Sequence, residues 1–542
     1  MNKLGKKLVS LLLSGIMVLS LTACGGSKQK VNDPDSTTNT ETVETTAPEA
    51  DTPEADASKI DTSKHVKVVY MTTGDPKNNG ATEAMLAELN KILTEKVNAE
   101  LEIYYIGWTD YLSNYNLTLA QMDGSVDLVG TATDWLDAWP NAQNGAFLEL
   151  SEDMISTYAP KTYAQVSADE WDECKYNGDI YFLPENHFTQ WTNHGFIYRG
   201  DWAAEAGLPT GPHSWQDMTT YFKGVKENHP DIIPWNSNGS ENIGLADGWM
   251  SSNTDSVRIE GINAGRMFGG SKDDLYTIWS PFYEGNELVE FAKLMKEWDN
   301  MGVWKTDVLN NTAADAGEDM QIGLTSVEQH HTNTWLGDSG FKTDQKQPGA
   351  DTGIFWFGEE NGNLVSTSIT HGAMAVSAAS KNPERALMVY DLLRNDPECY
   401  KLLNYGLEGV QYDITPEGYR KQTEGYTAEK DEIVTNYWWG RNDDLEILED
   451  GRNWEKYDAL CAEYDKVKIP YPYGKFVPDM TNIQAQVNNI NEIHDTYMGQ
   501  ISYGKYKGTA EDIVTEYRKA LKGAGIEEVI SELQTQIDAI YK

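Results

Sequence analysis

Basic residues are scarce in this chain of 542 residues. It carries 43 Lys and Arg against 85 Asp and Glu, so its formal net charge at pH 7 is −42. Nucleic acids and other polyanions bind through cationic side chains that neutralise their phosphates. The composition therefore disfavours a nucleic-acid partner.

Cysteine and long apolar runs are also rare. Beyond the N-terminus there is no apolar run of about 18 residues, the minimum for a confident membrane span. Of four cysteines, Cys174, Cys399 and Cys461 follow the N-terminal region, are odd in number and are widely spaced. This pattern predicts neither a disulfide framework nor a zinc site.

Sequence motifs of catalysis are missing as well. The chain has no Gly-x-Ser-x-Gly, His-Glu-x-x-His or P-loop pattern. We therefore expect no enzyme and no cofactor. A glycosidase-like carboxylate pair stays open as an alternative, because 85 acidic residues place such pairs throughout the chain.

The N-terminus has the features of a signal peptide. Three lysines precede an apolar segment from Leu8 to Leu21, and Leu-Thr-Ala-Cys at 21–24 is typical of a bacterial lipobox. We expect residues 1–23 to be removed and Cys24 to carry the lipid (acyl chains such as palmitate). An ordinary signal peptide with a chance cysteine is the alternative. The prediction places the protein on the outer face of the cytoplasmic membrane.

The segment after the lipobox is polar. Residues 25–64 contain no aromatic residue and almost nothing apolar larger than Ala, so they cannot bury enough surface to offset the entropy of ordering. We expect residues 24–64 to form an acidic disordered tether. The remaining length of about 480 residues exceeds one ordinary hydrophobic core and predicts two lobes.

The start of the folded part predicts a β–α–β unit. A short apolar run at 66–75 and the alternating residues Leu101, Ile103 and Tyr105 flank a segment with helical spacing. The stretch SVDLVGTATDW at 125–135 is an apolar strand that ends in Asp134 and Trp135. Ligands bind at the carboxyl ends of strands in open α/β sheets. We therefore expect Trp135 to face a ligand, whereas Trp139, one turn further on, should pack inward.

Several later segments resemble the family 1 extracellular solute-binding proteins of ABC importers, the group that includes maltose-binding protein. The resemblance rests on the lipobox and tether, on YNGDIY at 176–181, on YRGD at 198–201, and on STSITHGAMAVSAASKNPERALMVYDLL at 366–393. The stretch NYGLEGVQY at 404–412 is similar to a longer, lipoprotein-type branch from Gram-positive bacteria.

The resemblance implies an α/β fold of the type II, periplasmic-binding-protein-like class, with two lobes that close on a ligand. Crossovers between the lobes are expected near 185–195, 366–372 and 425–440. The expected lobe 1 comprises residues 65–188 and 369–430. The expected lobe 2 comprises residues 189–368 and 431–542.

Aromatic and polar residues at the expected strand ends and crossovers predict a sugar site. An indole offers a flat apolar face to the C–H face of a pyranose, while carboxylate, amide and guanidinium groups pair with hydroxyls. The candidates, each of which could also serve only a cap, a hinge or the core, are Asp75, Trp108, Asp134, Trp135, Glu185, Asn186, His187, Trp191, Trp249, Glu328, His331, Trp335, His371, Trp438, Trp439 and Arg441.

Two groups of residues receive a different interpretation. Adjacent His330 and His331 in an extended segment point in opposite directions, and no third ligand is placed, so we predict no metal site. Trp202, Trp215 and Trp298 lie on segments with helical spacing and are expected in the core.

The sequence thus predicts a monomeric, lipid-anchored binding component that delivers a carbohydrate, more specifically an oligosaccharide, to the permease subunits of an ABC importer. ATP hydrolysis would occur on another chain. Two alternatives stay open: a binding protein for a non-sugar solute such as a peptide, and a surface glycan-binding protein that is not coupled to import.

Overall fold

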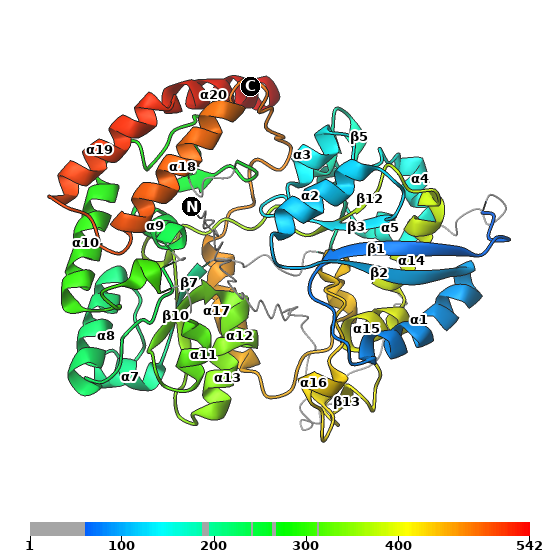
Figure 1. Ribbon diagram of the computed structural model, residues 1–542, viewed down its shortest axis with the longest axis horizontal. Coiled ribbons are helices and arrows are strands. Elements are labelled where there is room, and N and C mark those ends of the chain that lie inside the picture. The colour runs from blue at the N-terminus through cyan, green and yellow to red at the C-terminus, as the bar shows by residue number, and fades with distance from the viewer. Residues whose placement is uncertain (1–59, 187–193, 240–241, 263–266, 312–313) are drawn as a thin grey trace, which may run out of the picture.

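Two hydrophobic cores divide the chain into two lobes (Figure 1). The computed structural model describes residues 60–186, 194–239, 242–262, 267–311 and 314–542. The predicted signal peptide, Cys24 and most of the tether lie outside these residues. Within them, no helix is both long and apolar enough to cross a membrane. The predicted α/β fold with two lobes is confirmed.

Lobe 1 is built on a mixed five-stranded sheet with the strand order β2-β1-β3-β12-β6. Strand β1 pairs in parallel with β2 and β3, while β12 runs antiparallel to β3 and β6. The elements are β1 (Val66–Thr73), α1 (Ala81–Val97), β2 (Ala99–Ile106), α2 (Tyr111–Gln121), β3 (Leu128–Thr131), α3 (Ala138–Gln143), α4 (Glu152–Tyr158), α5 (Pro160–Gln165), α6 (Ala168–Glu173), β4 (Lys175–Tyr176), β5 (Asp179–Ile180), β6 (Leu183–Pro184), β12 (Ala373–Val376), α14 (Pro383–Asn395), α15 (Pro397–Tyr405), β13 (Tyr412–Ile414), β14 (Arg420–Gln422), α16 (Ala428–Asp431), and the 3-10 turns η4 (Trp438–Gly440) and η5 (Asp443–Leu445).

The sequence of β1 explains its central place in this sheet. VKVVYMTT is almost continuously buried, as expected of a strand covered on both faces. Helix α1 packs on the sheet through Met85, Leu89 and Leu93, which follow helical spacing and are fully buried. Because β1, β2 and β3 are parallel, the residues that follow them meet at one edge of the sheet.

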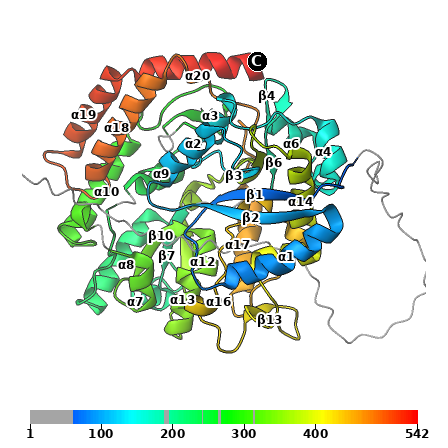
Figure 2. The same ribbon diagram turned by 45° about the vertical axis from the view of Figure 1, so that its right-hand side comes forward.

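Lobe 2 contains a smaller antiparallel sheet, β10-β7-β11, surrounded by helices. Its elements are β7 (His194–Tyr198), α7 (Gly200–Glu205), α8 (Trp215–Asn228), α9 (Asn242–Asn253), β8 (Ser256–Arg258), β9 (Gly269–Ser271), α10 (Glu287–Met301), η2 (Val308–Asn310), α11 (Ala316–Gln321), β10 (Val327–His331), α12 (Thr332–Gly337), α13 (Ser339–Lys346), β11 (Gly353–Trp356), η3 (Glu359–Asn361), α17 (Trp454–Val467), α18 (Gln484–Ile501), α19 (Ala510–Gly523) and α20 (Ile526–Tyr541). The last three helices curve over this lobe, and the end of α20 lies beside β4 of lobe 1 in Figure 2.

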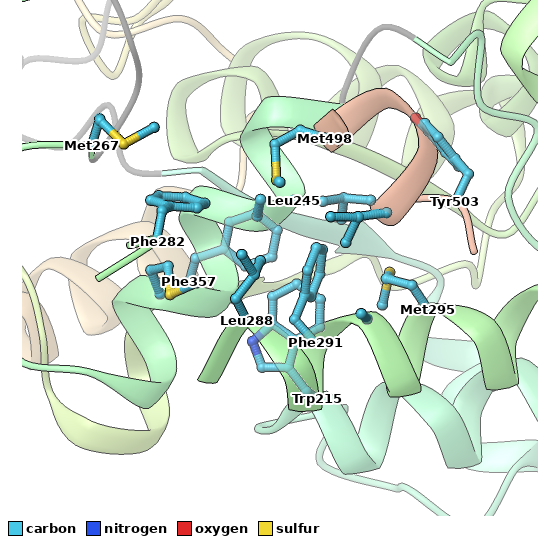
Figure 3. Packing of buried hydrophobic residues seen from close by; sticks show 14 of the residues in the cluster. Trp215, Leu245, Met267, Phe282, Leu288, Phe291, Met295, Phe357, Met498 and Tyr503 are labelled. Atoms are coloured by element: carbon cyan, nitrogen blue, oxygen red, sulfur yellow. The ribbon is translucent and has the colours of Figure 1, made fainter. Parts of the chain in front are cut away.

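The core of lobe 2 lies on one face of its sheet. Aromatic and methionine side chains from α8, α10 and α18 interdigitate there (Figure 3). Trp202, Trp215 and Trp298 belong to this core, as predicted. A smaller cluster covers the other face of the sheet, where Ile197 packs with Tyr457 of α17.

The third crossover differs from the prediction, which assigned all residues after 430 to lobe 2. Tyr437 and Trp439 instead pack in the core of lobe 1, and α17 is the next element that packs in lobe 2. The chain therefore crosses between η5 and α17. The reason is a close fit: a Cβ on Gly130 of β3 would lie 2.1 Å from the indole Nε1 of Trp439. Only glycine at this position leaves room for the indole against the sheet.

Candidate functional site

Four indoles and one phenol form an aromatic cluster on lobe 1. Trp108 lies nearly parallel to Trp135 and to Trp438, with ring centroids 6.3 Å and 6.1 Å apart. Trp135 also stacks on Trp439 at 5.7 Å, and Tyr111 packs against Trp108 at 5.9 Å. Trp439 is 1% exposed, whereas the other four rings are half-buried. The cluster therefore has a buried base and an accessible surface.

The sheet of lobe 1 positions this cluster. Trp108 follows β2 and Trp135 follows β3, so both indoles lie at the carboxyl edge of parallel strands. Trp438 lies at the same edge, on η4. The next residue of η4, Trp439, donates from Nε1 to Thr72 Oγ1 of β1 at 3.3 Å. The structure thus brings together the four predicted residues Trp108, Trp135, Trp438 and Trp439. The structure differs from the prediction for Trp439, which is buried beneath the other rings and supports them.

Beside the aromatic cluster, Asp134 and His371 form an ion pair. Their side chains approach to 3.2 Å and are 26% and 20% exposed. Burial opposes ionisation of Asp134, but His371 and Arg258 outweigh it and lower the pKa of the carboxyl. Burial likewise opposes protonation of His371, but Asp134 and Glu260 raise its pKa to about 9. Both side chains are therefore charged at neutral pH.

Lobe 2 faces this pair with two charges of its own. Arg258, at the end of β8, and Glu260 lie 3.9 Å apart. Arg258 acts on Asp134 and Glu260 acts on His371, so each charge of lobe 1 has an opposite charge across the lobe boundary. The lobes come close here, since a Cβ on Gly261 would lie 3.8 Å from the carbonyl oxygen of Thr133.

Further along the boundary, the candidates Glu185, Asn186 and Arg441 meet beside the first crossover. Glu185 is 7% exposed, and burial raises its pKa to about 7 although Arg441 and His371 act in the opposite direction. The backbone N–H of Asn186 donates to the Arg441 carbonyl at 3.0 Å, which joins the first crossover to the segment after η4. Burial and the nearby Glu446 raise the pKa of Asp443 to about 8. This part of the boundary is rich in carboxyl groups.

Asp75 lies at the same sheet edge as the aromatic cluster. It follows β1, its side chain is exposed, and its Oδ1 lies 2.9 Å from where a Cβ on Gly107 would stand, one residue before Trp108. This placement keeps Asp75 a candidate.

The structure does not bring the four candidates from lobe 2 to the aromatic cluster. Trp249 packs against Trp215 and Phe291 in the core, and its Nε1 donates to the Glu287 carbonyl at 2.8 Å. Trp335 is 5% exposed in the smaller core cluster. Both indoles therefore pack within lobe 2 and do not join the aromatic cluster.

Glu328 and His331 are engaged within lobe 2. Glu328 faces α11, where a Cβ on Gly317 would meet its carboxylate at 2.9 Å. The Nδ1 of buried His331 accepts from the Thr334 N–H at 3.2 Å and caps α12. Burial and the neighbouring His330 lower the pKa of His331 well below its usual range, so this imidazole is neutral.

The last two candidates, His187 and Trp191, lie outside the described residues. Among the residues that the structure does describe, no group of three or more His, Cys, Asp or Glu side chains is arranged to hold a metal ion.

Sequence reasoning missed Arg258 and Glu260. A signal was present, because Val257 and Ile259 are buried and alternate with these two charged residues. Such alternation indicates a strand with one polar face. The sequence does not show which residues this polar face meets, since Asp134 is more than 100 residues away in the chain.

Comparison with known proteins identifies related sequences and folds. The family model "bacterial extracellular solute-binding protein" matches residues 75–396, and a domain of unknown function matches residues 472–542. A carbohydrate ABC transporter substrate-binding protein of Streptococcus pneumoniae is 23% identical over 477 residues, which is 86% of this chain and 90% of the relative.

Two solved structures share the fold. The N-glycan transport solute-binding protein of Streptococcus pneumoniae matches with a TM-score of 0.70 at 22% identity, over 88% of this chain and 99% of that one. A human-milk-oligosaccharide (HMO)-binding, ABC-transporter-associated solute-binding protein of Bifidobacterium longum infantis matches with a TM-score of 0.63 at 17% identity, again over 88% and 99%.

Proposed function

The chain belongs to the family of bacterial extracellular solute-binding proteins, and on this premise we propose that it captures an oligosaccharide for an ABC importer. The observation that carries the proposal is the convergence of three half-buried indoles, Trp108, Trp135 and Trp438, at the carboxyl edge of one sheet. Three accessible indoles are more than one pyranose ring requires, which favours several sugar units over one.

In this proposal, the ligand first stacks on the aromatic cluster of lobe 1. Lobe 2 then closes over the ligand, with Arg258 and Glu260 opposite the Asp134–His371 pair as in the structure. The hydroxyls of a bound sugar pair with these charged groups, because charge-assisted hydrogen bonds are stronger than neutral ones. The protein binds and releases its ligand unchanged, as a monomer, and the closed form docks on the permease.

The proposal includes the attachment of the protein to the cell. The lipobox Cys24 carries a lipid on the outer face of the cytoplasmic membrane, and the acidic tether predicted over residues 24–64 joins it to the lobes. A tether of this length has an r.m.s. reach of about 35 Å. This distance lets the lobes meet both a diffusing glycan and the permease.

Isothermal titration calorimetry of lipid-free residues 25–542 tests the binding step. The panel contains high-mannose N-glycan fragments, human milk oligosaccharides and fructo-oligosaccharides, with short peptides as a second class. We expect submillimolar binding of at least one oligosaccharide and a loss of about tenfold or more in Trp135→Ala. Trp279→Ala, a half-buried indole of lobe 2 that follows the buried Ile278, is the matched control and should bind normally.

Two results would contradict the proposal. Binding of a peptide but of no sugar would reassign the ligand class. Equal sugar affinity in the wild type and Trp135→Ala would remove the aromatic cluster from the site.

A further inference from the structure

Residues 474–478 leave lobe 2, contact lobe 1 and return to lobe 2. On the N-terminal side, the Tyr473 hydroxyl accepts from the Gly270 N–H at 2.8 Å and donates to the Leu275 carbonyl at 2.6 Å. On the C-terminal side, the Gln536 side chain of α20 pairs with both the N–H and the carbonyl of Asp479, at 2.9 Å and 2.8 Å. The segment, which we call the strut, is thus fixed to lobe 2 at both ends.

Consecutive side chains of the strut enter opposite lobes. Phe476 is 5% exposed and belongs to the core of lobe 2, whereas Val477 packs against the core of lobe 1. Polar contacts flank this pair. Lys475 Nζ lies 3.1 Å from the Asp172 carboxylate of α6, and Gln143 Nε2 of α3 donates to the Pro478 carbonyl at 3.3 Å.

The fit between the strut and α6 is close. A Cβ on Gly474 would lie 2.3 Å from the Glu173 carboxyl group, so a side chain at this position would displace Glu173. Burial and the neighbouring Glu170 raise the pKa of Glu173 to about 7, while Lys475 acts to lower it.

We propose that the C-terminal segment, residues 472–542, acts through the strut. The strut contacts α3 and α6 of lobe 1 and limits the movement between the lobes to a rotation about this contact. The chain between the two lobe 2 anchors is short, and an extended residue spans at most about 3.6 Å. The strut therefore cannot follow lobe 1 outward. Separation of the lobes at this side requires Val477 to leave its apolar contacts, which costs free energy in proportion to the area exposed.

The strut acts in addition to the three crossovers of the chain. The crossovers join the lobes covalently, but the strut contacts lobe 1 only through side-chain and backbone interactions. A substitution can therefore remove this restraint while the chain stays intact. This inference concerns the ligand-free protein. It can fail while the proposed function holds, and the reverse is equally possible.

Spin-label distance measurements on ligand-free protein test the inference. Labels at Lys161→Cys on α5 and Gln216→Cys on α8 report the separation of the lobes, since both positions are exposed. Cys461 is half-buried and is replaced by Ser, while Cys174 and Cys399 are buried. We expect Val477→Asp to widen the interlobe distance distribution about twofold, because a carboxylate cannot remain in the apolar contact.

Matched variants separate this effect from general damage. Val477→Ile keeps an apolar side chain and should preserve the narrow distribution. Lys475→Glu alters an exposed residue outside both cores and should widen the distribution to a smaller degree, whereas Lys507→Glu, exposed on the same segment, should not. Near-ultraviolet circular dichroism checks that each variant is folded.

The result for Lys475→Glu decides the outcome if Val477→Asp does not fold. Distributions as narrow as the wild type in both Val477→Asp and Lys475→Glu would overturn the inference. Widening in Lys507→Glu to the same extent would also overturn it, because the effect would then follow net charge and not the strut.

Discussion

The two lobes present different chemistry where they face each other. Lobe 1 offers stacked indoles at the ends of parallel strands, whereas lobe 2 offers the charged residues Arg258 and Glu260 at the end of a short hairpin. The indoles of lobe 2 lie mostly in its cores, as Trp215 and Trp298 do. The difference teaches that the accessible indoles of lobe 1 gather at one edge of its sheet, whereas most indoles of lobe 2 fill its cores.

The largest expected effect comes from Trp439→Ala, which tests where the aromatic cluster ends and the core begins. The indole is 1% exposed and fits against Gly130. Its removal leaves a cavity that the sheet cannot fill, so we expect a loss of about 3–5 kcal/mol in the free energy of unfolding. Urea unfolding measures this loss. A loss no greater than that of Trp438→Ala would show that both indoles belong to the surface.

The contrast between the lobes is sharpest in the pair Trp438→Ala and Trp249→Ala. The first removes an accessible ring of lobe 1 and should weaken binding of the oligosaccharide found by calorimetry about tenfold, or about 1.4 kcal/mol. The second removes a core ring of lobe 2 and should lower stability with unchanged affinity. The reverse pattern would exchange the roles that we give to the two lobes.

The Asp134–His371 pair predicts a dependence of stability on pH. The pKa of His371 is raised to about 9 from a usual value of 6.5, so the pair stabilises the fold fully below pH 6.5 and this contribution is lost as the pH rises through 9. We expect His371→Gln to lose about 1–2 kcal/mol at pH 6 and little at pH 9.5. Denaturant unfolding at the two pH values measures the difference. An equal loss at both would assign the effect to packing.

The smallest effect is expected for Arg258→Gln. Arg258 is 39% exposed, so solvent weakens its attraction to Asp134 in the ligand-free protein. We expect glycan affinity to fall about threefold, and the fall should shrink at 0.5 M salt because salt screens exposed charges. Lys507→Gln, which changes the net charge by the same single unit, serves as the control. A change of tenfold or more would mean that Arg258 is a principal ligand contact.

The sequence predicted the part of the site that follows from strand order. Trp108 and Trp135 come directly after apolar strands, and parallel strands end at one edge, so their meeting could be foreseen. Trp249 could not be assigned in this way. Two glycines in GLADGWM at 244–250 are typical of a loop, but the segment lies in α9, where a Cβ on Gly248 would be 2.2 Å from the ring of Phe357. The glycine marks close packing of a helix.

The lobe boundary was harder to predict for a related reason. The family resemblance implied a third crossover near 425–440, next to Trp438 and Trp439. The slot over Gly130 accepts one of them, and it is formed by a strand about 300 residues away in the chain. Such a long-range fit leaves no local trace in the sequence. The same holds for Val477, whose apolar partners belong to the other lobe.

The closeness of the indoles also gives the protein a built-in optical reporter. Ring centroids between 5.4 and 6.3 Å join Trp108, Trp135, Trp438 and Trp439. At such separations the electronic transitions of the indoles couple, so the excited state is shared among the rings. A sugar that displaces water from the cluster or tilts one ring would alter both the near-ultraviolet dichroism and the emission wavelength. Occupancy could thus be followed without any attached dye.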